Sequence, residues 1–203
     1  MAYHGWLWHK VRKEPLKTVI GATANARRFW VSAMMEDYEK KNILIVQSLR
    51  NTIMDSTAMA NTSIVVSCGL AAIITSTYSL KKPPDNIYGE HGELVFTVKF
   101  VTLLFFLLSS FVCHSLSIRL INQVNYLFVI PQVPTSTVTP EYVSKLLEKA
   151  FVLSTVGNRL LYTALPLVLW IFGPVPVLLC SIIMVPILYN HDFGNRDEEK
   201  LRI

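Results

Sequence analysis

Small polar residues recur at helical spacing within residues 50–80. Asp55, Thr62, Gly69 and Ser76 occur every seven residues, which places them on one face of an α-helix. A carboxylate attracts cations, and hydroxyl oxygens can replace part of a cation's hydration shell. The pattern predicts a cation-conducting face, with Asp55 at one mouth, made of these residues: Thr52, Asp55, Met59, Thr62, Val66, Gly69 and Ser76.

The same face has a structural alternative. Small residues let two helices approach closely, and hydroxyls bond across an interface or to their own backbone. A second polar line, Ser56, Ser63 and Ser67, runs beside the first. Packing against another helix is therefore the alternative to lining a water-filled path.

Further charges lie in or near the other apolar segments. Glu90 and Glu93 predict a second cation-attracting ring, a vestibule at the opposite mouth. Arg159 lies inside an apolar segment, where a fixed charge costs about 2.5–3.5 kcal/mol on insertion scales. An ion pair with Asp55 would lower this cost and would also weaken any pore field from Asp55. Lys99, close to a boundary, is expected to extend toward the interface.

The remaining reactive side chains lack the spacing of an enzyme or a metal site. The five histidines show no ligand motif, and the three cysteines form no close-spaced pair: Cys68, Cys113 and Cys180. No nucleophile, phosphate-binding or nucleic-acid motif is present. We expect no catalysis, no metal, no cofactor and no nucleic-acid partner. An enzyme would need Asp55, His114 and Arg159 to converge, whereas His114 alone is expected to pack or to hydrogen-bond.

The composition favours a membrane protein as the setting for these residues. Hydrophobic residues make up 52% of the chain and charged residues only 16%, and the mean hydropathy is +0.40. Charged residues are about a quarter of an ordinary soluble domain. The length of 203 residues and the even composition indicate a single domain over residues 1–203.

Four stretches approach the roughly 20 apolar residues that a helix needs to cross a hydrocarbon core. They cover about residues 57–78, 94–116, 150–172 and 174–190. Gly173, Pro174 and Pro176 separate the last two, because they interrupt a helix and permit a reversal. Backbone groups in lipid must be satisfied internally, so the spans are helices. The predicted fold is all-α, a polytopic membrane protein with four transmembrane helices and cytosolic or interfacial helical extensions.

The distribution of basic residues predicts the orientation. Lysine and arginine gather before the first span, between residues 119 and 149, and in the tail at 191–203. Basic segments favour the cytosolic side, so both termini are expected there and the 81–93 loop on the opposite side. The net charge of +5 fits this topology and contact with anionic membrane lipids.

Residues 1–50 form the predicted cytosolic or interfacial amphipathic region. Trp6 and Trp8 lie in an aromatic stub too short to span, and they are expected to anchor at the membrane interface. One helix is predicted over 25–50, either on the membrane, as a stalk below the first span, or against a neighbouring subunit. Thr139 followed by Pro140 predicts the start of the helix that leads into the third span.

Four long sequence segments resemble those of a known family. The phrases are RRFWVSAMMEDYEKKNILIVQSLRNTIMDSTAMANTSIVVSCGLAAIITSTYS, HSLSIRLINQVNYL, VTPEYVSKLLEKAF and VGNRLLYTALPLVLWIFGPVPVLL. Through them the chain resembles, over residues 3–193, the plant branch of the family called domain of unknown function 599. Members of that family usually carry a further apolar segment before YHGWLWHKVR, so the resemblance implies a missing or shortened first helix. The family itself implies no activity.

The chain is also similar to the WeiTsing type of short plant membrane protein. This resemblance implies a homopentamer, a calcium-permeable cation pathway and a place in the endoplasmic reticulum membrane. It carries no motif that assigns pore residues, so the residues proposed above rest on helix-face spacing alone.

The sequence therefore predicts a homo-oligomeric cation channel that conducts passively through a central pore lined by the first span. Acidic rings would concentrate cations, hydroxyls would replace hydration water, and an apolar constriction would gate by dewetting. One four-helix subunit offers little room for a wet path, so this prediction requires several copies. The alternative is a non-conducting membrane scaffold or adaptor whose cytosolic helices bind a partner.

Overall fold

The computed structural model describes residues 2–79, 93–129 and 138–193. Within these ranges the chain is helical and contains no strand, which confirms the predicted all-α class. The elements are α1 (Ala2–Lys13), the short 3-10 helix η1 (Pro15–Lys17), α2 (Val19–Glu36), α3 (Tyr38–Ser79), α4 (Glu93–Val129), α5 (Pro140–Trp170) and α6 (Pro174–Phe193).

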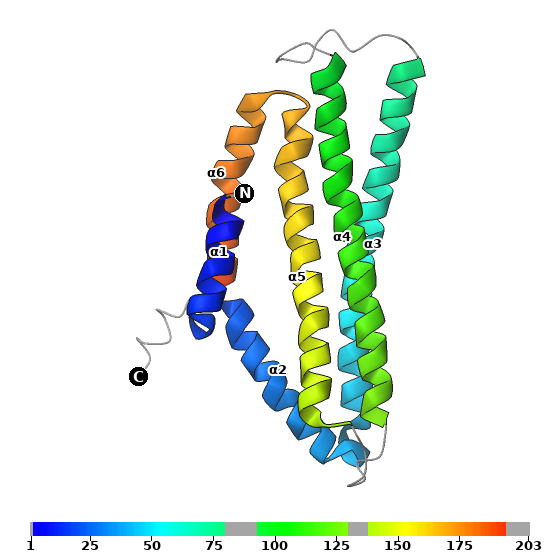
Figure 1. Ribbon diagram of the computed structural model, residues 1–203, viewed down its shortest axis with the longest axis vertical. Coiled ribbons are helices and arrows are strands. Elements are labelled where there is room, and N and C mark those ends of the chain that lie inside the picture. Colours follow the sequence, from blue (N-terminus) through cyan, green and yellow to red (C-terminus); the bar gives the residue numbers. More distant parts are fainter. Residues whose placement is uncertain (1, 80–92, 130–137, 194–203) are drawn as a thin grey trace.

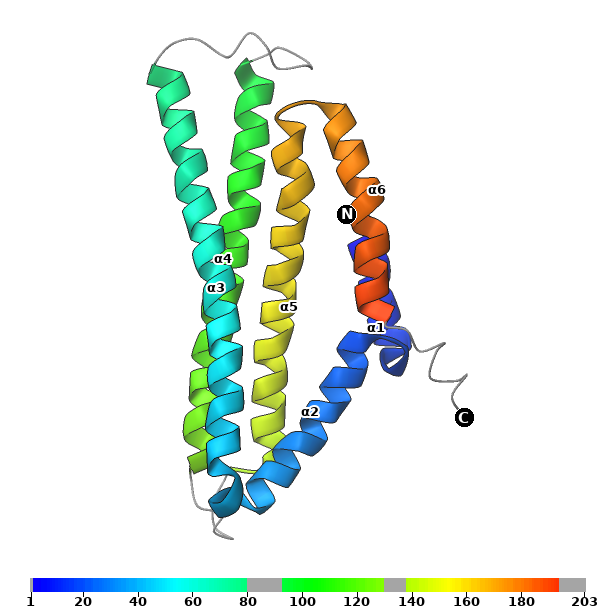
Figure 2. The same cartoon turned by 180° about the vertical axis from the view of Figure 1, so that it is seen from behind.

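The long helices stand in a row at their upper ends. There the order is α3, α4, α5 and α6 (Figure 1). α1 lies beside the lower part of α6, and α2 runs diagonally from α1 to the foot of α3. Figure 2, seen from behind, shows that α3 crosses α4 lower down. The foot is therefore a bundle in which α2, α3, α4 and α5 share one core.

Four helices are long and apolar enough to cross a membrane. They are Lys40–Ser76, Val95–Phe128, Pro140–Trp170 and Pro174–Phe193. α3 has 42 residues, α4 has 37 and α5 has 31, whereas a bilayer needs only about 20. The chain is therefore built as an integral membrane protein whose three longest helices continue beyond the hydrocarbon region.

Two helix boundaries occur where the sequence predicted them, and one occurs where it did not. Thr139 caps α5, its hydroxyl accepting from the backbone N–H of Tyr142 at 3.2 Å. Gly173 adopts a φ of 140°, which allows the turn into α6. The single helix predicted over 25–50 is wrong, because the chain breaks at Asp37 between α2 and α3. This break lets α2 turn back toward α5, against which it packs.

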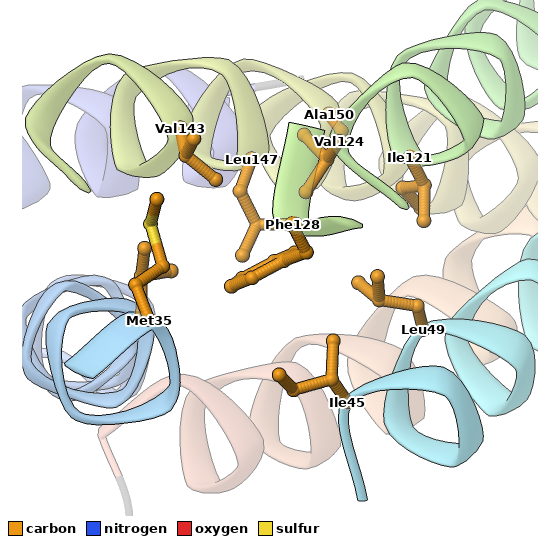
Figure 3. Packing of buried hydrophobic residues seen from close by; sticks show 10 residues of the cluster. Met35, Ile45, Leu49, Ile121, Val124, Phe128, Val143, Leu147 and Ala150 are labelled. Carbon is orange, nitrogen blue, oxygen red and sulfur yellow. The ribbon is translucent and has the colours of Figure 1, made fainter. Parts of the chain in front are cut away.

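An apolar core joins four helices at the foot of the row. Met35 of α2, Ile45 of α3, Phe128 of α4 and Leu147 of α5 point toward one another (Figure 3). All are at most 4% exposed. Ile45 and Leu49 of α3 are thus packed inside the protein rather than on a free surface helix. A second core lies near the opposite end and includes Leu70, Leu103 and Ala164.

Candidate functional site

The predicted conducting face lies on the side of α3 that its neighbours leave largely uncovered. Asp55, Thr62, Val66, Gly69 and Ser76 are exposed, and Thr52 and Met59 are half-buried. The residues that contact α4 and the cores fall one position later along α3, for example Ser56, Ser63 and Leu70. One position is about 100° of rotation in a helix. The seven residues therefore form a face about a quarter-turn away from the packing seam.

The hydroxyls of this face donate to their own helix. Thr52 donates to the carbonyl of Ser48, Thr62 to that of Ala58 at 2.9 Å, and Ser76 to that of Ile73. A hydroxyl that has given its proton to the backbone still has acceptor lone pairs. These oxygens can therefore accept from water, or approach a cation, without losing their helix bonds.

Gly69 leaves open space on this face, and Asp55 gives the face a negative charge. A Cβ built on Gly69 would meet nothing within 4 Å. Asp55 is exposed, and no ion pair joins it to any residue that the structure describes. Glu90 lies outside the described residues. Glu93 is the first residue of α4, and its side chain is also outside the description.

Arg159 is neutralised by a different partner from the one expected. Its Nη2 pairs with Oδ1 of Asp192, near the end of α6, and not with Asp55. The Asp192 carboxylate is fully buried and also accepts from the hydroxyl of Tyr3 at 2.6 Å. The pair ties α5, α6 and α1 together. It also removes the predicted competition, because Asp55 is not used to neutralise Arg159.

Two side chains of α1 beside the Arg159–Asp192 pair have shifted pKa values. Burial, with the carboxylate of Asp192, raises the pKa of the Tyr3 phenol. Burial, with the positive charge of Arg159 nearby, lowers the pKa of His4. Both shifts favour neutral side chains on α1 beside the ion pair.

The second polar line of α3 packs inside the row. Ser63 donates to Ser110 of α4 at 3.1 Å, and Ser110 donates to the carbonyl of Gly157 on α5 at 2.8 Å. Ser117 of α4 donates to the carbonyl of Ala150. Small side chains with short hydrogen bonds hold three helices close together at this level. For Ser56, Ser63 and Ser67 the packing alternative is the one that the structure supports.

His114 lies in the same layer, fully buried against Gly157. Neither ring nitrogen has a hydrogen-bond partner among the described residues. Packing, rather than hydrogen bonding, is its observed role. Within the described part of the chain, no three His, Cys, Asp or Glu side chains gather in a way that could hold a metal ion.

Lys99 differs from its expected position. It is only 8% exposed, and its Nζ donates to the backbone carbonyl of Trp170, the last residue of α5, at 3.3 Å. The last carbonyls of a helix lack intrahelical partners and carry partial negative charge. The expectation that Lys99 extends to the interface is therefore wrong, because a helix end satisfies its charge inside the protein.

Sequence reasoning missed Asp192 as the partner of Arg159. The sequence did contain a clue, because Asp192 is the one acidic residue in the 20-residue α6, and a lone acid in an apolar helix needs a partner. The roles of Ser110 and Ser117 had no comparable signal, because a serine in an apolar helix often bonds to its own backbone.

Comparisons with known proteins support one assignment. No similar curated protein and no similar solved structure was found. Residues 1–196 match the family model described as "Protein of unknown function, DUF599". Because this match covers nearly the whole sequence, the chain belongs to the DUF599 family.

Proposed function

We propose that several copies of this chain assemble around a central axis and conduct cations along a path lined by α3. The observation that carries the proposal is the uncovered polar face of α3 with Asp55, which forms no ion pair with the described part of the chain. A charged residue inside or close to a membrane is costly unless it has a partner or faces water. A water-filled path at an oligomer axis would provide that environment.

The shape of one copy explains why assembly is needed. In one copy the long helices pack on one another around apolar cores, and the polar face of α3 lies outside this packing, so a path along that face lacks its other walls. A ring of copies that turn α3 inward would supply the missing walls. The similarity to WeiTsing-type proteins supports a pentamer, calcium permeability and the endoplasmic reticulum membrane for this assembly.

Each part of the α3 face would have its own task during permeation. A ring of Asp55 carboxylates would raise the local cation concentration at one mouth. Thr62 and Ser76 would offer hydroxyl oxygens, and Val66 would form an apolar ring that closes by dewetting. Conduction would be passive, without a cofactor or a covalent step.

The experiment is electrical recording from the purified chain in planar bilayers under a calcium-to-potassium gradient. Asp55→Asn keeps the size of the side chain and removes its charge. We expect the reversal potential to move toward the potassium equilibrium potential, because the neutral ring no longer concentrates divalent cations. Glu90→Gln with Glu93→Gln tests the opposite mouth in the same way.

Glu141→Gln is the matched control. Glu141 is an exposed acid in the first turn of α5, paired with Lys145, and is not part of the α3 face. We expect its reversal potential to equal that of the unaltered chain. An equal shift in both variants would mean that a general surface charge, and not the α3 ring, sets selectivity.

A non-conducting scaffold is the second candidate. It is favoured by the hydroxyl bonds of α3 to its own backbone, since such side chains also suit a close helix–helix contact. In that case Asp55→Asn would alter assembly, and bilayers containing the folded oligomer would carry no ionic current.

A further inference from the structure

A cavity of about 390 Å³ lies between the amino-terminal helices and α5. This volume falls within the range of small-molecule sites. Apolar side chains of α1 and α2 form one wall, and apolar side chains of α5 form the other: Leu7, Val11, Ile20, Val152, Val156 and Leu160. The cavity shares no residue with the polar face of α3.

One end of the cavity carries a cation with an unused donor. Arg27 of α2 pairs with Glu148 of α5, with Nη2 at 3.1 Å from Oε2, and its guanidinium lies 4.1 Å from the centre of the Phe151 ring. Its Nε has no hydrogen-bond partner among the described residues. The Arg27 side chain is 21% exposed and that of Glu148 is 24% exposed. Nε itself is enclosed by protein atoms, so the exposed part of the side chain lies elsewhere. A ligand oxygen can approach this exposed part of the cation, and anionic oxygens are the preferred acceptors of a guanidinium.

Basic residues outnumber acidic ones on α1 and α2, whose side chains form one wall of the cavity. The last turn of α1 holds Lys10, Arg12 and Lys13, and Arg12 lies over the ring of Trp8, which lines the cavity. Arg28 follows Arg27 on α2. Glu14 and Glu148 offset only part of this charge. A ligand with a net negative headgroup is favoured over a zwitterionic one.

The length of the apolar part matches one lipid tail. Leu160 follows Phe151 by nine positions on α5, which is about 14 Å at the rise of an α-helix. One leaflet of a hydrocarbon core is about 15 Å deep. Around Leu160 the lining becomes polar, with Arg159, Thr163 and His4, and Arg159 is already paired with Asp192. Thr155 lies within the apolar stretch, where its hydroxyl donates to the carbonyl of Phe151. The apolar space therefore ends where an acyl chain of one leaflet would end.

We propose that this cavity binds one acyl chain of an anionic phospholipid from the surrounding membrane. The phosphate would lie against the exposed part of the Arg27 guanidinium, and the acyl chain would run along α5 beneath α1. Bound in this way, the lipid would fill the space between α5 and the α1–α2 pair and hold the amino-terminal helices against the row. The proposal does not depend on ion conduction.

The test is native mass spectrometry of the purified full chain with an equimolar mixture of dioleoylphosphatidylglycerol and dioleoylphosphatidylcholine. We expect one phosphatidylglycerol per chain, preferred by about tenfold, as a charge-assisted contact provides. Val156→Trp fills the cavity, so its phosphatidylglycerol binding should fall by about tenfold or more. Leu165→Trp is the control, since Leu165 is exposed on the same helix and does not line the cavity.

The double variant Arg27→Gln with Glu148→Gln removes the headgroup contact without leaving an unpaired charge. It should still bind both lipids and should lose the preference for phosphatidylglycerol. Thermal unfolding and elution volume establish that each variant is folded. The proposal is overturned if folded Val156→Trp binds as the unaltered chain does, or if phosphatidylcholine binds equally well. It is also overturned if inorganic phosphate displaces the lipid completely, because that result identifies a site for the anion alone.

Discussion

At the scale of single residues, the ion pair of Arg159 and Asp192 is the most consequential contact outside the α3 face. The Arg159 side chain is 15% exposed and that of Asp192 is fully buried. Neither charge has access to much water, so each depends on the other. Tyr3 adds a hydrogen bond to the same carboxylate and extends the contact to α1.

Removing one partner should destabilise the protein strongly. Asp192→Asn leaves the guanidinium of Arg159 without its counter-charge, and breaking a buried pair costs about 3 kcal/mol or more. Thermal unfolding in detergent measures the change. Glu141→Gln, which breaks an exposed pair with Lys145, should change stability little. Comparable losses in the two variants would contradict a buried structural role for the Arg159 pair.

Stability should depend on pH through His4. Because burial lowers its pKa in the folded protein, the unfolded chain binds more protons below the ordinary value of 6.5. Stability should therefore be present above that value and be lost as the pH falls through the lowered pKa. His4→Asn should show a smaller loss in unfolding temperature between about pH 7.5 and about pH 5 than the unaltered chain. Equal losses would mean that other groups cause the acid sensitivity.

At the scale of elements, α3 has two polar lines with different surroundings. Ser63 and Ser67 are buried against α4, whereas Thr62 and Ser76 are exposed. The heptad spacing predicted both lines, because helical periodicity is a local property. It did not predict which line packs, since that depends on where α4 lies. Likewise, spacing predicted one helix over 25–50 and missed the break at Asp37, because the folding of α2 back onto α5 is a tertiary effect.

The contact between α4 and α5 should be sensitive to one methyl group. A Cβ at Gly157 would lie 2.7 Å from two ring atoms of the buried His114. Gly157→Ala should lower the free energy of unfolding by about 1–3 kcal/mol through overpacking. Adding His114→Ala should recover part of that loss, and a double-mutant cycle by thermal unfolding measures the coupling. Strict additivity of the two changes would contradict direct contact.

At the scale of the whole molecule, the polar face of α3 lies outside the apolar cores, and α6 lies on the far side of α5 from α4 (Figure 1). The pore proposal requires the α3 faces of several copies to meet around an axis.

Cross-linking between cysteines on chosen helix faces tests the arrangement of copies. Gly69 lies on the uncovered face of α3, whereas Cys180 lies on α6. With the natural cysteines replaced by serine, chains that carry Gly69→Cys should form covalent dimers in membranes with a short bis-maleimide, and chains that keep only Cys180 should form few. Preferential linking through Cys180 would place α6, not α3, at the interface between copies.

The most direct measurement combines recording with chemical modification of the α3 face. In a chain whose natural cysteines are replaced by serine, Thr62→Cys is exposed to a cationic methanethiosulfonate reagent during bilayer recording. The conductance should fall on modification, because the added charge would stand in the ion path. Val112→Cys, on the exposed side of α4, should be unaffected. Undiminished current through modified Thr62→Cys, or equal block at Val112→Cys, would contradict a path lined by α3.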